Sequence, residues 1–197
     1  MNISGLLIAA LIAASAGTAY AQAQTADGSG SGDVDTRSSK IAFGQVAATP
    51  RGYYDMCRQR PGLCRIVKGR LPTLPDGSVA LTGAAMRQLE AVNAEVNAAI
   101  TPSRREDWGA GESDGDCKDF ALTKQQRLLR AGWPSSAVRA AIVLTRSGQR
   151  HMVLVARTSN GDFVLDNLNA RIVAWTSVPY RWEKIQSKSD MWRWNSL

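Results

Sequence analysis

Histidine and cysteine are scarce in this chain of 197 residues, which has one histidine, His151, and three cysteines, Cys57, Cys64 and Cys117. Structural zinc sites take four ligands, mostly from these two residue types. Zinc binding is therefore improbable. The scarcity also leaves one candidate imidazole and few candidate thiols for nucleophilic chemistry.

Long hydrophobic runs are also lacking beyond the N-terminus. The apolar stretch 3–16 carries no charge but is shorter than the ~20 residues of a membrane span,. Ala19-Tyr20-Ala21 supplies the small residues of a cleavage site,. We interpret 1–21 as a signal peptide, which predicts a periplasmic or secreted protein with no stable membrane span after cleavage.

Large apolar residues are almost absent from 22–40, where Gly and Ser alternate, so this segment is predicted to be a flexible linker,. Residues 41–197 are long enough for one domain with its own core. The formal charge is +7. In an exported protein this charge favours acidic partners or simply a soluble basic surface. The basic residues do not cluster with stacking aromatics, so nucleic-acid binding is not expected.

Cysteine pairing follows from the compartment, because an oxidising environment favours disulfides and three cysteines leave one unpaired. Cys57 and Cys64 flank a short segment with a Pro-Gly turn and are the natural pair. Cys117 is then a free thiol. A buried inert cysteine is the alternative, but its neighbours, Asp116, Lys118 and Asp119, are not typical of a core.

The pattern of apolar residues predicts an α+β fold with N-terminal helices packed on an antiparallel β-sheet. Helices are expected at 78–100, capped by Ser78, and from 116 or 117 to 131, ended by Gly132. Trp108 lies in a polar loop between them, where it either covers the core or lines a cleft and binds substrate. Strands are expected at 137–145, 152–158, 162–168, 171–175 and 181–186,.

Cys117, His151 and Asp166 follow one another in the order of one class of thiol nucleophile. A cysteine in the first turn of a helix lies where free N–H groups favour an anion. His151 can serve as base and Asp166 can orient it. A two-residue turn at Asn160-Gly161 places Asp166 opposite residue 155, four residues from His151, so a bulge or longer loop is required. Each residue alone is as well explained by a structural role.

Oxygen ligands for calcium are also available beside the thiol. Glu112, Asp114, Asp116 and Asp119 lie within eight residues. The run does not match the EF-hand loop. A solvated acidic loop that caps a helix explains it equally well.

Several segments together resemble the bacterial transglutaminase-like cysteine peptidases, the family of the LapG-type periplasmic proteases, which release surface adhesins. The resemblance covers roughly residues 40–195. The Cys57/Cys64 segment and the tail rich in Trp and Arg contribute to it. It is carried mainly by Gly115-Asp116-Cys117-Lys118-Asp119-Phe120-Ala121, Ala131-Gly132-Trp133-Pro134, the run 151–155 and the run 161–167.

The resemblance implies a papain/transglutaminase-like fold in which Cys117 is the nucleophile, His151 the base and Asp166 the orienting acid. The adhesin-cleaving members bind calcium through acids on either side of the nucleophile, of which Asp116 is present here. Asp116 and Asp119 are the candidate calcium ligands of this chain. Lys118 stands where they have an acid. We therefore expect no required cofactor, and we hypothesise that the lysine replaces part of the effect of the cation.

The predicted function is that of an exported cysteine peptidase. It hydrolyses a peptide bond in a protein substrate, such as a surface adhesin or another envelope protein, through an acyl-enzyme. A transamidase with the same triad is one alternative. The other is a non-catalytic binding module that retains the fold.

Overall fold

The computed structural model describes residues 39–197 except 105, 106 and 112. The predicted signal peptide, the linker up to residue 38, and Glu112 lie outside the described residues. The last two residues of the expected linker contact the domain: the Ser39 carbonyl accepts from the Asp162 amide, and Lys40 pairs with Asp76 at 2.7 Å. Within the described part of the chain, no helix has the length and apolar character to cross a membrane.

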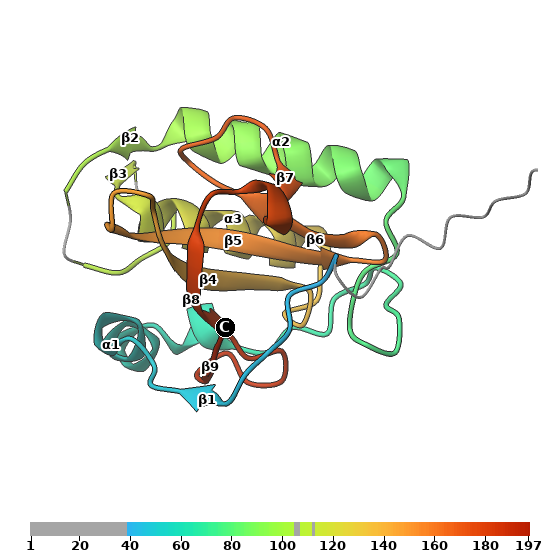
Figure 1. Cartoon of the computed structure of the whole chain (residues 1–197), viewed down its shortest axis with the longest axis horizontal. Coiled ribbons are helices and arrows are strands. Elements are labelled where there is room, and N and C mark those ends of the chain that lie inside the picture. The colour runs from blue at the N-terminus through green and yellow to red at the C-terminus, as the bar shows by residue number, and fades with distance from the viewer. Residues whose placement is uncertain (1–38, 105–106, 112) are drawn as a thin grey trace, which may run out of the picture. The chain divides into compact units, whose positions relative to one another are not determined.

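An antiparallel sheet dominates the described residues and has the strand order β1-β9-β8-β4-β5-β6-β7 (Figure 1). Residues 101 and 102 form a separate short parallel pair with 114 and 115. The strands are β1 (Val46–Ala47), β2 (Thr101–Pro102), β3 (Asp114–Gly115), β4 (Val138–Leu144), β5 (Arg150–Thr158), β6 (Gly161–Leu165), β7 (Val173–Ala174), β8 (Arg181–Gln186) and β9 (Trp194–Ser196).

Helices α2 and α3 run side by side along the sheet (Figure 1). Leu89 and Val96 of α2, Leu128 of α3, and Leu154 and Leu165 of the strands form one buried cluster between them. The α+β class and the packing of helices on an antiparallel sheet are confirmed. The helical elements are α1 (Arg51–Gln59), η1 (Pro61–Cys64), α2 (Gly83–Ala99), α3 (Cys117–Ala131) and η2 (Trp175–Ser177).

Helix α2 begins at Gly83, so the predicted start at Ser78 is wrong. Thr82 is the N-cap, and its hydroxyl accepts from the Ala85 amide at 3.1 Å. The segment before it is extended instead, because Val79 bridges to Thr158 and its amide donates to the Arg157 carbonyl. Backbone pairing with β5 thus replaces the first turns of the expected helix.

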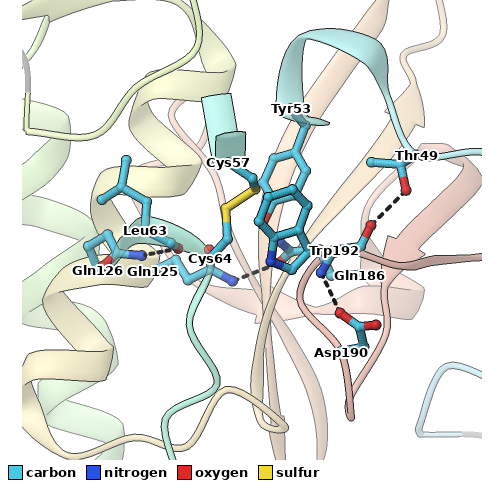
Figure 2. The surroundings of a disulfide bond; sticks show 10 residues. All are labelled: Thr49, Tyr53, Cys57, Leu63, Cys64, Gln125, Gln126, Gln186, Asp190 and Trp192. Carbon is cyan, nitrogen blue, oxygen red and sulfur yellow. Dashed lines mark hydrogen bonds between the residues drawn. A yellow bond between two sulfur atoms is a disulfide. The ribbon is translucent and has the colours of Figure 1, made fainter. Parts of the chain in front are cut away.

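Helix α1 was not predicted from the sequence, and the disulfide fixes it in place. Cys57 of α1 and Cys64 of η1 are bonded, with their Cα atoms 5.6 Å apart, as the sequence predicts. Figure 2 shows the pair beside Tyr53, whose hydroxyl accepts from Gln186 at 2.7 Å. Cys57 and Cys64 pack against Leu122 of α3. The platform formed by α1 and η1 therefore supports the helix that carries Cys117.

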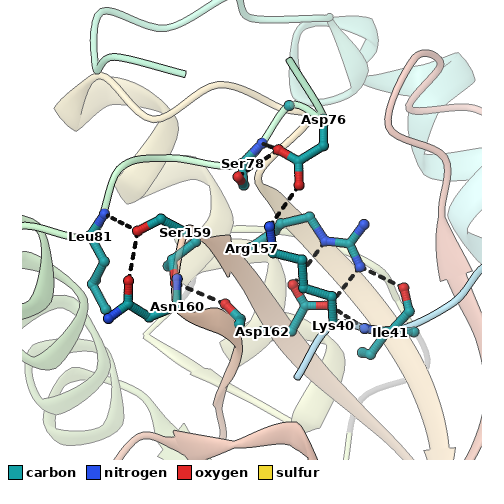
Figure 3. A network of polar contacts seen from close by, with 12 residues as sticks. Lys40, Ile41, Asp76, Ser78, Leu81, Arg157, Ser159, Asn160 and Asp162 are labelled. Carbon is teal, nitrogen blue, oxygen red and sulfur yellow. Dashed lines mark hydrogen bonds and ion pairs between the residues drawn. The ribbon is translucent and has the colours of Figure 1, made fainter. Parts of the chain in front are cut away.

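The β5–β6 hairpin is held by a buried ion pair. Arg157 donates to both carboxylate oxygens of Asp162, at 2.9 and 2.7 Å, and also to the Ile41 carbonyl at 2.6 Å (Figure 3). The Ile41 amide donates to Asp162 in return at 2.7 Å. The pair thus ties the hairpin to the N-terminal segment of the described domain.

We predict that Asp162→Asn destabilises the fold by about 3 kcal/mol, because it leaves the buried Arg157 guanidinium without a counter-charge. The measurement is urea unfolding at neutral pH. Asp76→Asn is the matched control: Asp76 pairs with Lys40 at the surface and its loss should cost less than about 1 kcal/mol,. Equal effects of the two substitutions would contradict the role given to the buried pair.

Candidate active site

The start of α3 is fixed by a reciprocal cap around Cys117. Asp116 is the N-cap; its carboxylate accepts from the Lys118 amide at 3.1 Å, and its own amide donates to Asp119 at 3.0 Å. A Cβ at Gly115 would lie 2.6 Å from the Asp119 side chain, so only glycine allows this close approach. Gly132 ends the helix with φ +106°, as predicted,.

Cys117 is the first residue of α3, and its thiol is free and half-buried. The unpaired amides and the positive dipole end of a helix favour an anion at this position. The residue is therefore accessible and placed where a thiolate is stabilised.

His151 and Asp166 lie in contact beside this thiol. His151 Nε2 and Asp166 Oδ1 are 2.7 Å apart, and the two side chains are only 6% and 2% exposed. Tyr180 donates to the second carboxylate oxygen at 2.6 Å, and the Leu168 amide donates to the first at 3.0 Å. Asn97 of α2 donates to the Asp166 backbone carbonyl at 2.9 Å. Both oxygens of the carboxylate are therefore occupied and its orientation is fixed.

The register of the hairpin explains why the two residues meet. Thr158 pairs with Gly161 and Leu154 with Leu165, so Asp166 follows opposite residue 153. The tight turn is 159–160, and Gly161, with φ +114°, is already in β6. The expected turn at 160–161 was wrong by one position. The separation from His151 along the strand is thus two residues instead of four, and diagonal neighbours on one face are within reach of long side chains.

The His151 ring is hydrogen-bonded to Cys117 as well as to Asp166. Since Nε2 faces Asp166, the other ring nitrogen, Nδ1, faces the thiol. Burial alone lowers the pKa of His151, but the hydrogen bonds to Asp166 and Cys117 outweigh it and raise this pKa to about 9,. For Asp166, burial raises the pKa and the hydrogen bond from His151 more than offsets it, so the pKa is lowered. His151 and Asp166 are therefore both charged at neutral pH.

Two cavities meet at Cys117 and His151. One, of about 470 Å³, extends toward β2 and the β4–β5 turn, and the other, of about 190 Å³, toward α1. Both are also lined by Asp116 and Arg150. The remaining lining residues are Pro102, Ser103, Arg104, Gly115, Phe120, Thr145, Gln149, Asn167 and Leu168 of the larger cavity, and Pro50, Trp108, Lys118, Ile142 and Met152 of the smaller.

Trp108, the predicted substrate contact, lines the smaller cavity and also packs on the core. Its ring lies edge-to-face against Tyr53 of α1, with the centroids 6.0 Å apart. The Gly111 amide, three residues on, donates to Thr123 of α3 at 2.8 Å. Both roles considered for this residue are therefore compatible with its position.

Lys118 lies between the acids considered as calcium ligands. Its ammonium group is 2.6 Å from Asp116 Oδ2 and 3.8 Å from Asp119 Oδ2. A bound cation would have to displace this ammonium group. Nowhere in the described residues do three or more His, Cys, Asp or Glu side chains gather as metal ligands. Among the described residues, the Lys118 ammonium group therefore stands where a cation between Asp116 and Asp119 would lie.

Two residues of the site were missed by sequence reasoning. Tyr180 precedes β8 and meets Asp166 and the His151 ring only through the tertiary fold. Arg150, the residue before His151, lines both cavities. No local pattern marks either residue.

Comparison with protein families settles what kind of chain this is. Residues 43–197 match the family described as bacterial transglutaminase-like cysteine proteinases, BTLCP. The chain belongs to this family. No curated protein matches it.

Solved structures similar to this BTLCP member include LapG of Legionella pneumophila, with 25% identity and a TM-score of 0.46. The match covers 50% of this chain and 63% of LapG, so less than two thirds of LapG is spanned. LapG in a calcium-bound form matches with 25% identity over the same shares and a TM-score of 0.44. An EGTA-treated form matches with 26% identity and a TM-score of 0.44, over 50% of this chain and 61% of that one.

We predict that Asp166→Asn lowers the pKa of His151 by more than about one unit, because the carboxylate stabilises the imidazolium. Since His151 is the only histidine, NMR titration of its ring protons reports this pKa without ambiguity. Tyr180→Phe is the control: it removes a donor to Asp166, so the imidazole pKa should stay or rise slightly. A fall of equal size in both variants would contradict the assignment.

The same pKa predicts a pH dependence of stability. The pKa of His151 is about 9 in the fold, above the ordinary value of 6.5 expected in the unfolded chain. The contribution of His151 to the free energy of unfolding is therefore fully present below about pH 6.5 and is lost as the pH rises through about 9. Urea unfolding across this pH range should show this loss of stability in the wild type. The Asp166→Asn variant should show little of it.

Proposed function

We propose that this protein is a cysteine peptidase in which Cys117, His151 and Asp166 form the catalytic triad. The observation that carries the proposal is the line of contacts from the thiol at the start of α3, through the His151 ring, to Asp166. It lies where two cavities meet, so an extended substrate chain can pass across the thiol. Membership of a cysteine proteinase family supports it.

The reaction begins with the imidazolium–thiolate pair. The Cys117 thiolate attacks the carbonyl carbon of the scissile peptide, and the first-turn amides of α3 stabilise the negative oxygen that forms. His151 gives its proton to the leaving nitrogen as the C–N bond breaks. A thioester remains on Cys117.

Water completes the cycle. His151, now neutral, takes a proton from water as its oxygen attacks the thioester carbonyl, and Cys117 leaves as a thiolate. Asp166 holds the ring in one orientation and stabilises the imidazolium in both steps. The arrangement implies a papain/transglutaminase-like site, and the predicted signal peptide implies a periplasmic or secreted enzyme acting on an envelope protein, such as a surface adhesin.

We predict that Cys117→Ala abolishes cleavage of a proteome-derived peptide library, measured by mass spectrometry of the new termini. Asp166→Ala should reduce kcat/KM by several orders of magnitude, as expected for loss of the orienting acid. Exchange of Ser147, an exposed polar residue of the β4–β5 turn, for Ala should have no effect. Cleavage that persists in Cys117→Ala would exclude Cys117 as the nucleophile.

The two alternatives give different results in related assays. If a primary amine replaces water, amide products rather than free carboxylates accumulate when amine is added, and the protein is a transamidase. If Cys117 in the folded protein reacts with iodoacetamide no faster than a free thiol at neutral pH, the binding-module hypothesis is favoured and the peptidase proposal fails.

Calcium should be unnecessary for this peptidase, because the Lys118 ammonium already lies against Asp116 and Asp119. We predict that EGTA leaves the activity unchanged and that calorimetry detects no calcium binding. Lys118→Glu should create calcium affinity, and Lys118→Gln, which removes the charge without adding a carboxylate, should not. Inactivation of the wild type by EGTA, or no gain in affinity in Lys118→Glu, would contradict this.

A further inference from the structure

Lys124 is a buried lysine on the helix that carries Cys117. It lies seven residues, about two turns, after Cys117 and therefore on the same helix face. Its side chain is 0% exposed, and its ammonium group has no hydrogen-bond partner among the described residues. Burying a charged amine without a partner costs stability. A residue selected for packing alone would not be lysine at this position.

Asp166 is the charged group that acts on this amine. Burial lowers the pKa of Lys124 to about 7, and the charge of Asp166 opposes the shift. On the strands packed against α3, Arg139 of β4 stacks on Phe43, while on β5 Arg157 pairs with Asp162 and Arg150 with Glu183. On α2, Glu95 pairs with Arg127 at the surface. His151 of β5 contacts Asp166 itself. Lys124 therefore senses the carboxylate of the proposed triad.

We propose that Lys124 is a positioning residue of the active site, whose buried amine acts on Asp166 from α3 through its charge, while His151 holds the same carboxylate by a hydrogen bond. This inference rests on the proposed function. Asp166 then has two cationic neighbours, and protonation of one weakens its hold on the other. Conversely, the ionised carboxylate is what allows an ammonium ion to persist in this apolar setting.

The effect of the Lys124 charge on His151 and Asp166 depends on pH. As the pH falls through about 7, Lys124 takes up a proton. The added positive charge disfavours a further proton on His151 and helps keep Asp166 ionised. The cost to the fold is greatest when Lys124 is charged, below about pH 7. It diminishes as the pH rises toward 10.5, where the unfolded lysine also loses its proton.

The test uses the single histidine of the full chain as a reporter. In a Cys117→Ala background, which removes the thiol titration, the His151 ring resonances should follow a two-step pH curve. One step belongs to the imidazole and the smaller one, near pH 7, to Lys124. Lys124→Met, of similar length without charge, should leave one step. A two-step curve unchanged by Lys124→Met, or a one-step curve before the substitution, would overturn the proposal.

Measurements of Tm and of kcat and KM on Lys124 variants that keep Cys117 distinguish a positioning role of Lys124 from a purely structural one. Lys124→Met should raise Tm, more at pH 6 than at pH 10, while kcat falls about tenfold with KM nearly constant. Lys124→Gln, the second variant, should show a single titration step of the His151 ring, as expected for Lys124→Met. A lowered Tm together with unchanged kcat would mark Lys124 as structural. The NMR titration needs no enzymatic activity. The Lys124 inference can therefore fail while the peptidase proposal stands, and the peptidase proposal can fail while the Lys124 inference stands.

Discussion

The pairing of β5 with β6 places the two residues that define the site. Leu154 lies opposite Leu165, so Asp166 emerges from the hairpin on the same face as His151 and two residues away along the strand. A slip of one residue would turn Asp166 to the other face, because side chains alternate along a strand. The buried Arg157–Asp162 pair and the positive φ of Gly161 both act within this hairpin. The geometry of the candidate site thus depends on interactions several residues from the His151–Asp166 contact.

The second constraint is the start of α3. The Asp116–Asp119 cap ends the preceding loop at Cys117, and the disulfide platform of α1 and η1 packs on the same helix. The helix therefore presents its thiol to a strand whose register is set independently. Neither element alone creates the site; the hydrogen bond between Cys117 and His151 requires both.

Features encoded by short sequence signals were predicted well, and features created by tertiary contact were not. The bounds of α3 follow from Asp116 and Gly132, which are local caps,. The start of α2 was misplaced because Val79 pairs with the distant Thr158. The turn was misplaced by one residue because Gly161, with φ +114°, pairs with Thr158 as the first residue of β6, which leaves 159–160 as the turn.

For the candidate site, too, the residues marked by sequence patterns were predicted, and those placed only by tertiary contacts were not. Cys117, His151 and Asp166 were predicted as site residues from chain order, cysteine counting and family resemblance, and the fold brings the three into contact. Tyr180 and Lys124 were not found, since a tyrosine before a strand and a lysine within a helix are ordinary in sequence. Only its burial in the fold reveals that Lys124 stands where an apolar residue is expected.

The two lysines of α3 share a physical logic. Lys118 holds a positive charge 2.6 Å from Asp116, beside Cys117, and the Lys124 amine lies within the field of Asp166. A basic side chain is part of every molecule, whereas the occupancy of a bound ion depends on its concentration. In this protein, an ammonium group occupies the position between Asp116 and Asp119. Under the proposed function, the positive charge beside Cys117 therefore does not depend on the supply of a metal.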